Sequence, residues 1–332
     1  MNTQNDILAA GDFSTQTFIA PSGAELCVRH MKASPPVKGI IHINHGAAEH
    51  SERYLEFAQT MSAQGFHVFA HDHRGHGATS VPGIPSHVFG EDGWNLVIED
   101  ALALGAHIKG AIPKLENDHG GQELPFILAG HSMGAVVAFE MLLRDPVCAD
   151  GLLLSGPVLQ KNSAMPVLQS LLKMEAAFKE PESISTLFQK LAWDPLNKPY
   201  KPARTAYDWL SRDEDEVDKY LADPECGWPP TVNFAVELSK GLAKTYKDAR
   251  LKSLRSDMPV LMMSGSHDSS TANGASVAEL EKRLTEAGAK RISSKIFPEM
   301  RHELFNERDR EQVYDYVSEW CHSFCQGTVT SN

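Results

Sequence analysis

The amino-acid sequence predicts an α/β fold: a doubly wound, mostly parallel sheet into which a helical cap is inserted. Short apolar segments alternate with segments of helical spacing over residues 1–157. The alternation stops in residues 158–255, where long helical segments and prolines replace it, and it resumes in residues 256–332. We therefore expect one core in two parts, 1–157 and 256–332, with residues 158–255 as a cap or lid.

The expected strands are short apolar runs bounded by turn residues. The first two form a hairpin around Pro21-Ser22-Gly23. The later runs are nearly continuous in apolar residues, which indicates strands buried on both faces, as in a parallel sheet. The runs span residues 17–20, 25–30, 39–44, 66–70, 125–129, 151–155, 259–263 and 291–297.

Helical spacing recurs between these runs. Val97, Ala101 and Leu104, for example, fall on one face of a helix, and Gly65 is a plausible stop for the helix before it. The expected core helices span residues 51–63, 94–112, 134–143, 276–287 and 308–324. Strand and helix in alternation at this spacing predict helices on both faces of the sheet.

Composition and charge disfavour nucleic acids and anionic membrane surfaces as partners. The chain has 332 residues, of which 42% are hydrophobic, and its formal net charge is -12. Nucleic acids and anionic membrane surfaces attract clustered positive charge, which an acidic chain offers poorly. We expect no nucleic-acid partner and a neutral or zwitterionic substrate.

Cysteine usage and the absence of an apolar leader predict the compartment. The five cysteines are odd in number and include no CxxC pair, which indicates reduced thiols. No histidine cluster accompanies Cys321 and Cys325, and no metal is expected. The N-terminal residues lack a basic segment followed by an apolar one, and no run approaches the ~20 apolar residues of a membrane helix. We expect a soluble, cytoplasmic protein.

The sharpest motif is Gly130-His131-Ser132-Met133-Gly134, which follows an expected strand and opens an expected helix. This is the context of a G-x-S-x-G nucleophile elbow, whose tight turn presents a serine hydroxyl above the edge of the sheet. Glycines at 130 and 134 avoid collisions with neighbouring backbone. Because so short a pattern also occurs by chance, the flanking strand and helix carry the interpretation. They predict Ser132 as a nucleophile.

A serine hydroxyl needs a base, and the base needs an acid that orients it. After a nucleophile elbow the expected chain order is serine, acid, histidine. Asp268 follows the run 259–263 and His302 follows the run 291–297, so both belong to loops at the carboxyl end of the sheet. We predict Ser132, Asp268 and His302 as the catalytic residues.

Other titratable residues fit this order less well, because they precede the elbow, lie at the wrong end of a strand, lie in the closing helix or adjoin a predicted member. They are His119, Asp257, His322, His267 and Glu299. Of these, Glu299 could still assist His302.

Acyl transfer also needs two N–H donors for the developing oxyanion. The N–H of Met133 lies just after the nucleophile, at a helix N-terminus that carries positive partial charge. The second donor is expected at Ala47, in the loop that follows the run 39–44. The alternative is a polar loop without a role, but the preceding strand directs this loop to the edge where Ser132 is expected.

With these residues in place, the chain resembles the monoglyceride lipase and lysophospholipase-like branch of the α/β-hydrolases, which carry a hydrolase domain of the serine aminopeptidase S33 type. The resemblance extends from about Phe18 to Phe324. It rests on motifs in the expected order, which are His45-Gly-Ala-Ala-Glu-His-Ser-Glu-Arg-Tyr54, Asp72-His-Arg-Gly-His-Gly77, Gly130-His-Ser-Met-Gly134, Gly265-Ser-His-Asp268 and Arg301-His302-Glu303, with Leu210-Ser-Arg-Asp213 and Asp223-Pro224 in the cap.

The resemblance implies the α/β-hydrolase fold and hydrolysis of carboxylic esters, such as monoacylglycerols or lysophospholipids, without a cofactor. It assigns Ser132, Asp268 and His302 as the triad, and Ala47 and Met133 as oxyanion donors. Ala48 departs from the family, which often has glycine there, and this side chain is expected to narrow the acyl entrance without removing the donor at Ala47.

The cap region leaves two interpretations open for residues 165–178. This stretch is apolar on more than one side, so it could bind acyl chains or contact a membrane transiently, or it could pack on the core. Three other functions also remain: a short-chain carboxylesterase, an amidase or peptidase with the same triad, and a degenerate hydrolase that serves as a scaffold. A complete set of Ser132, Asp268 and His302 argues against the scaffold.

Overall fold

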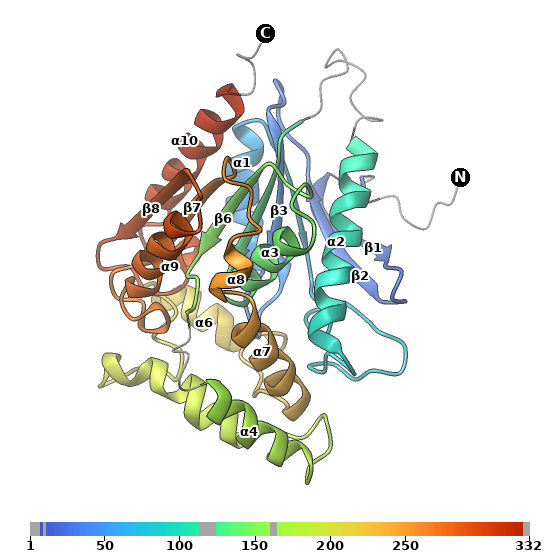
Figure 1. Cartoon of the computed structure of the whole chain (residues 1–332), viewed down its shortest axis with the longest axis vertical. Coiled ribbons are helices and arrows are strands. Elements are labelled where there is room, and N and C mark those ends of the chain that lie inside the picture. The colour runs from blue at the N-terminus through green and yellow to red at the C-terminus, as the bar shows by residue number, and fades with distance from the viewer. Residues whose placement is uncertain (1–6, 9–10, 113–123, 160–164, 328–332) are drawn as a thin grey trace.

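A computed structural model describes residues 7–8, 11–112, 124–159 and 165–327 of the chain (Figure 1). Its centre is a single sheet of eight strands. In spatial order these are β1 (Asp12–Ile19), β2 (Glu25–Met31), β4 (Phe66–His71), β3 (Gly39–Asn44), β5 (Phe126–His131), β6 (Gly151–Ser155), β7 (Pro259–Gly265) and β8 (Arg291–Phe297). The order confirms the predicted doubly wound sheet.

The sheet is parallel except at one edge. β1 pairs with β2, and β2 with β4, in antiparallel fashion, whereas every neighbouring pair from β4 to β8 is parallel. The short turn after β1 permits only a hairpin, while the later strands are joined by helical crossovers, which a parallel pair requires. The parallel strands therefore end at one common edge.

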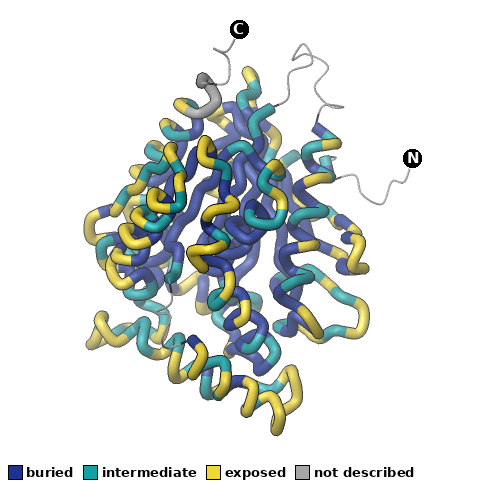
Figure 2. Tube along the Cα trace, in the orientation of Figure 1, coloured by how far each residue is buried: buried dark blue, intermediate teal, exposed yellow. Residues whose placement is uncertain are grey.

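Helices cover both faces of the sheet. Alternate residues of β5 show why: Phe126 and Leu128 belong to one apolar cluster, and Ile127 and Ala129 to another. Side chains of successive residues point to opposite faces of a strand, so both faces need cover. The first cluster includes α2 (Gly93–Ala111), α3 (Met133–Arg144) and α9 (Ala275–Glu286), and the second includes α1 (Leu55–Ala63) and α10 (Glu311–Gly327). The buried trace in Figure 2 follows the sheet between these layers.

The segment between β6 and β7 lies beyond the carboxyl edge of the sheet, at the bottom of Figure 1. It contains no long strand among its described residues. Its helical elements are α4 (Met165–Ala176), α5 (Thr186–Phe188), α6 (Glu214–Ala222), α7 (Val232–Lys244) and α8 (Asp248–Leu251), with a π turn at Gln189–Trp193 and a 3-10 segment at Asp194–Tyr200. Its position places it over the loops in which the functional side chains are expected.

Two predicted helix starts differ from the structure. Residues Ser51–Tyr54 form a 3-10 turn before α1, because the Asp72 carboxylate accepts hydrogen bonds from the Ser51 N–H at 2.8 Å and its hydroxyl at 2.5 Å. The closing helix begins at Glu311 rather than 308. There the buried Glu307 carboxylate accepts hydrogen bonds from the N–H groups of Arg301 and Arg308, which holds the chain in a turn.

Cys27, Cys148 and Cys226 have free thiols, and His119 lies outside the described residues. Within the described ranges, no helix is both long enough and apolar enough to cross a bilayer.

Candidate active site

Ser132 lies between the end of β5 and the start of α3, with φ 52° and ψ -114°. Positive φ is uncommon for a residue with a side chain and costs on the order of 1–3 kcal/mol. Its N–H donates a hydrogen bond to the Ser155 carbonyl at 2.9 Å, and its carbonyl accepts one from Ala135 at 3.1 Å. The turn is therefore held on both sides by backbone hydrogen bonds.

The two glycines of the elbow allow an approach that no side chain would permit. A Cβ atom at Gly130 would lie 2.2 Å from the carbonyl oxygen of Gly134. One at Gly134 would lie 2.0 Å from the carbonyl oxygen of Asn44, at the end of β3. The first glycine lets the strand fold back onto the helix, and the second lets α3 contact β3. This contact brings the loop after β3 beside the elbow.

Ala47 and Met133 line the same cavity as Ser132. Met133 is the first residue of α3, where an N–H has no partner within the helix. Ala48, which follows Ala47, has φ 54°. Its carbonyl accepts hydrogen bonds from the Tyr220 hydroxyl and the Gly227 N–H, both at 2.9 Å. A left-handed backbone favours glycine, so Ala48 holds a conformation that is uncommon for a residue with a side chain.

Asp268 and His302 lie together at the carboxyl edge, as the chain order predicts. His302 Nδ1 is 2.9 Å from Asp268 Oδ2, and both side chains are buried. Gly265 makes this closeness feasible: a Cβ there would lie 2.0 Å from the Met300 carbonyl oxygen, so the loop after β8 can pack against the end of β7. The imidazole is oriented by the carboxylate, with its other nitrogen left for a second partner.

Ser270, which sequence reasoning did not single out, joins this pair. Its hydroxyl donates to Asp268 Oδ1 at 2.6 Å and lies 2.7 Å from His302 Nδ1. Its N–H also donates to Asp268 Oδ1, at 2.8 Å. The carboxylate thus has donors on both oxygens, which fixes its orientation toward His302.

Burial and pairing act in opposite directions on the two titratable groups. Burial alone would raise the pKa of Asp268, but the charge of His302 and its hydrogen bond, with those of Ser270, lower it to about 2. Burial would lower the pKa of His302, but the nearby Asp268 raises it above the ordinary value of 6.5. Asp268 therefore stays ionised near neutral pH and favours a protonated imidazole.

A cavity of about 670 Å³ opens over these residues. Its base contains Ser132, His302 and Ser270, together with the Ala47–Met133 pair. Its walls come mainly from apolar side chains of the segment between β6 and β7, including Leu168, Leu171, Phe188, Leu191, Trp193, Leu238 and Leu242. Ser132, Ser270 and His302 thus line the same chamber as these apolar side chains.

Two buried carboxylates, Glu49 and Glu303, also line this cavity. Arg53 joins them, at 2.8 Å from Glu49 and at 2.6 Å from both oxygens of Glu303. Glu49 also accepts the Gly46 N–H at 2.5 Å, which holds the loop that carries Ala47. All three residues lie in motifs that carry the resemblance, but the sequence did not indicate that they pair with one another.

The segment between β6 and β7 contacts His302 and Glu303 directly. The ring centroids of Trp209 and His302 lie 5.0 Å apart, and the Leu210 carbonyl accepts a hydrogen bond from the Glu303 N–H at 2.8 Å. No local pattern in the sequence indicated this contact, because it joins residues almost a hundred positions apart.

The alternatives weighed from sequence lie away from this pair. Glu299 does not assist His302: its side chain is 77% exposed and is 3.6 Å from Arg212. The exposed His267 and Asp257 likewise contact neighbours in their own loops, Ser266 and Arg255. His322 lies against Lys38, at 3.1 Å.

The arrangement can be compared with known proteins. Residues 35–309 match the model of a hydrolase family described as serine aminopeptidase, S33. The chain belongs to this family. It is an α/β-hydrolase of the monoglyceride lipase-like kind, as the eight-stranded sheet and the relatives agree.

The alignments with individual relatives cover most of this chain. Monoglyceride lipase of Homo sapiens is 28% identical over 293 residues, 86% of each chain. Monoacylglycerol lipase of Mycolicibacterium smegmatis is 27% identical over 310 residues, 92% of this chain and 96% of its own. A thermostable carboxyl esterase from Bacillus coagulans, solved with glycerol, shares the fold, with a TM-score of 0.77 at 20% identity over 94% and 98% of the two chains.

Proposed function

We propose that the protein is a serine ester hydrolase that uses Ser132, Asp268 and His302 as its triad and forms an acyl-enzyme. The observation that carries this proposal is the shared cavity: the elbow serine, the histidine paired with a buried carboxylate, and the Ala47–Met133 loops all face it. No cofactor is needed for this chemistry.

In the proposed first step His302 accepts the Ser132 proton as the serine oxygen attacks the ester carbonyl carbon. The N–H groups of Ala47 and Met133 stabilise the resulting oxyanion, a contribution of about 10²–10³ in turnover for each donor. His302 then donates the proton to the leaving alcohol. In the second half water attacks the acyl-enzyme and His302 accepts its proton. His302 then donates this proton to the Ser132 oxygen as the acid leaves, which restores the serine hydroxyl and the neutral imidazole.

The cavity favours a long acyl chain with a neutral, hydroxylated leaving group. Its apolar walls suit an alkyl chain, since burial of each CH₂ contributes about 0.8 kcal/mol. Near the base, the carboxylates of Glu49 and Glu303 can accept hydrogen bonds from hydroxyl groups. Two buried carboxylates would repel a phosphate. Among the expected substrates, monoacylglycerol therefore fits better than a lysophospholipid.

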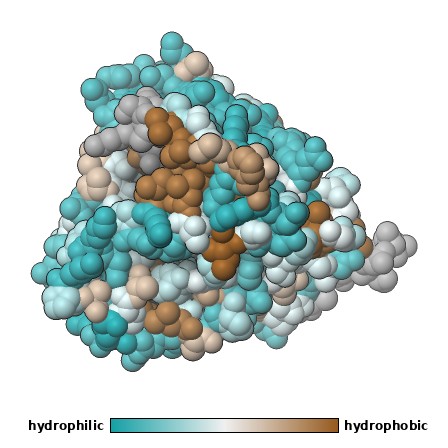
Figure 3. Space-filling view, turned by 90° about the horizontal axis from the view of Figure 1, so that it is seen from below, coloured by the Kyte–Doolittle hydropathy of each residue, from teal (hydrophilic) through white to brown (hydrophobic). Residues whose placement is uncertain are grey.

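We further propose that residues 158–255 act as the cap of this site and contact lipid transiently. Several large apolar side chains of this segment are exposed, among them Val167 (61%), Met174 (58%) and Phe178 (86%). Figure 3, seen from the side of α4, shows apolar residues gathered on this face. Val167 also lines the cavity, so the apolar face and the cavity are continuous. Contact with a lipid surface would then bring the substrate to the opening.

The experiment is to measure acid release from monoacylglycerols of several chain lengths, a lysophospholipid, short aryl esters and an aryl amide, with Ser132→Ala as control. We expect the highest kcat/KM with a long-chain monoacylglycerol and loss of all activity in the variant. Activity confined to short esters would withdraw the lipid substrate but keep the triad. Activity that persists in Ser132→Ala would contradict the nucleophile.

A further inference from the structure

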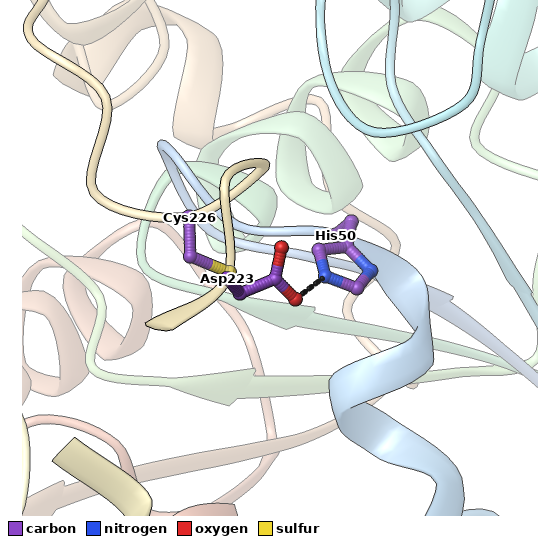
Figure 4. Close-up of side chains that lie close together, drawn as sticks. All are labelled: His50, Asp223 and Cys226. Atoms are coloured by element: carbon purple, nitrogen blue, oxygen red, sulfur yellow. Dashed lines mark hydrogen bonds and ion pairs between the residues drawn. The ribbon is translucent and has the colours of Figure 1, made fainter. Parts of the chain in front are cut away.

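Three side chains with metal-binding atoms lie together outside the active-site cavity. His50, Asp223 and Cys226 each offer one ligand atom, and these atoms all lie within 4.8 Å of one another (Figure 4). His50 Nε2 is 2.8 Å from Asp223 Oδ2. His50 and Cys226 are buried, and the Cys226 thiol is free. Imidazole, carboxylate and thiol in this combination are the ligand types that Zn²⁺ accepts.

We propose that His50, Asp223 and Cys226 form a binding site for a thiophilic divalent cation of the Zn²⁺ class. Thiolate and imidazole ligands favour such ions over Mg²⁺ and Ca²⁺, which prefer oxygen. Binding forms metal–nitrogen, metal–oxygen and metal–sulfur bonds and breaks the sulfur–hydrogen bond. The thiol proton passes to solvent, and nothing is oxidised or reduced. Water completes the coordination of a three-ligand site.

The surroundings favour a cation. The charges that act on Cys226 come from three carboxylates, those of Asp223, Glu49 and Glu303, and from one guanidinium, that of Arg53. The excess of carboxylates favours the approach of a positive ion. Asp223 is the ligand nearest to solvent, with 34% of its side chain exposed, and it gives an ion a route to the buried partners.

The site would join two parts of the molecule. His50 belongs to the loop after β3 that carries Ala47, whereas Asp223 and Cys226 follow α6 of the cap. These segments already meet where the Gly227 N–H donates to the Ala48 carbonyl at 2.9 Å. A cation that bonds to both segments adds a link that exists only in the folded protein, so it stabilises the fold by mass action. This inference does not depend on the identity of the substrate.

The first experiment uses Cd²⁺, whose bond to a thiolate gives an ultraviolet charge-transfer band. The full-length protein is titrated with Cd²⁺ alongside Cys226→Ser and Cys148→Ser, the latter removing another free, partly buried cysteine. We expect the band to appear in the wild type and in Cys148→Ser, and to be lost in Cys226→Ser. No band in the wild type, or equal loss in both variants, would overturn the proposal.

The second experiment keeps the thiol and removes a different ligand. Asp223→Asn should weaken Cd²⁺ binding at least about tenfold, since even residues outside the direct ligands contribute that much in metal sites. Zn²⁺ should raise the thermal midpoint of the wild type, whereas Mg²⁺ should not, and Cys226→Ser should abolish the Zn²⁺ shift. Unchanged Cd²⁺ affinity in Asp223→Asn, or an equal Zn²⁺ shift in Cys226→Ser, would place the ion elsewhere and reject the site.

Discussion

The backbone of Gly156 leaves the space that the imidazole ring of His302 occupies. Gly156 has φ 59°, and a Cβ atom there would lie 2.9 Å from Cε1 and 3.0 Å from Nδ1 of His302. It directly follows β6, so the sheet itself sets the position of the ring. Gly156→Ala should therefore displace His302 and lower kcat by about 10²-fold, the effect of roughly 1 Å of misplacement. Steady-state kinetics with a preferred ester measures this.

Gly83→Ala is the matched control for this substitution. Gly83 also has positive φ, 76°, but nothing lies within 4 Å of an added Cβ. Both variants should incur similar backbone strain, of about 1–3 kcal/mol. Only Gly156→Ala should lose activity. Equal activity in the two folded variants would contradict the claim that Gly156 makes room for His302.

The pH dependence of kcat/KM should report His302. The imidazole acts as a base only when neutral, and Asp268 raises its pKa above 6.5, so activity should rise with pH with a midpoint above 6.5. Asp268→Asn should move this midpoint to lower pH, because burial without the carboxylate lowers the pKa. It should also reduce kcat by up to about 10⁴-fold. An identical midpoint in the variant would refute the pairing, and Asp257→Asn, an exposed carboxyl near the same strand, serves as control.

Buried neutral histidines should make the fold sensitive to acid. Burial lowers the pKa of His42 to about 3, against 6.5 in an unfolded chain. Between these values the unfolded state binds a proton that the folded state does not, so the free energy of unfolding falls as pH falls from about 6.5 toward 3. The slope is up to about 1.4 kcal/mol per pH unit for one histidine.

Urea unfolding of His42→Gln between pH 7 and pH 4 tests this linkage. As the pH falls, the free energy of unfolding should decrease less steeply in the variant than in the wild type. The two slopes should differ by up to about 1.4 kcal/mol per pH unit, the contribution of one histidine. His267→Gln, which replaces an exposed histidine, should keep the wild-type slope. Parallel pH profiles for all three proteins would show that His42 is not held neutral by the fold.

Arg53 should stabilise the folded protein, because it is the cation that pairs with two buried carboxylates at the cavity. It pairs with the buried Glu303 and Glu49, and its removal leaves two buried carboxylates without a cation. Arg53→Met should reduce the free energy of unfolding by about 3–5 kcal/mol, measured by urea unfolding. Arg204→Ala, which breaks an exposed pair with Asp218, should have little effect. Adding Glu303→Gln to Arg53→Met should recover part of the loss; a further decrease would argue against this account.

The local sequence was sufficient for the parts of the protein that depend on neighbours along the chain. Residues 126–129 of β5 are all buried and apolar, and a Cβ atom at Gly130 would collide with the backbone of Gly134, only four residues away. The order of the loops follows from strands and helices in alternation. These features predicted the fold class, the elbow and the loops that carry Asp268 and His302, because period and turn chemistry are local properties.

Contacts across long sequence distances were decided by tertiary structure alone. Trp209 against His302, Arg53 between two carboxylates, and His50 beside Cys226 each join segments that no periodicity relates. Burial also decides charge: the layers packed on both faces of the sheet enclose His42 and lower the pKa of its imidazole, so this side chain is neutral. The physical reason is that desolvation and pairing depend on which surfaces meet in space. The sequence determines those contacts only through the complete fold.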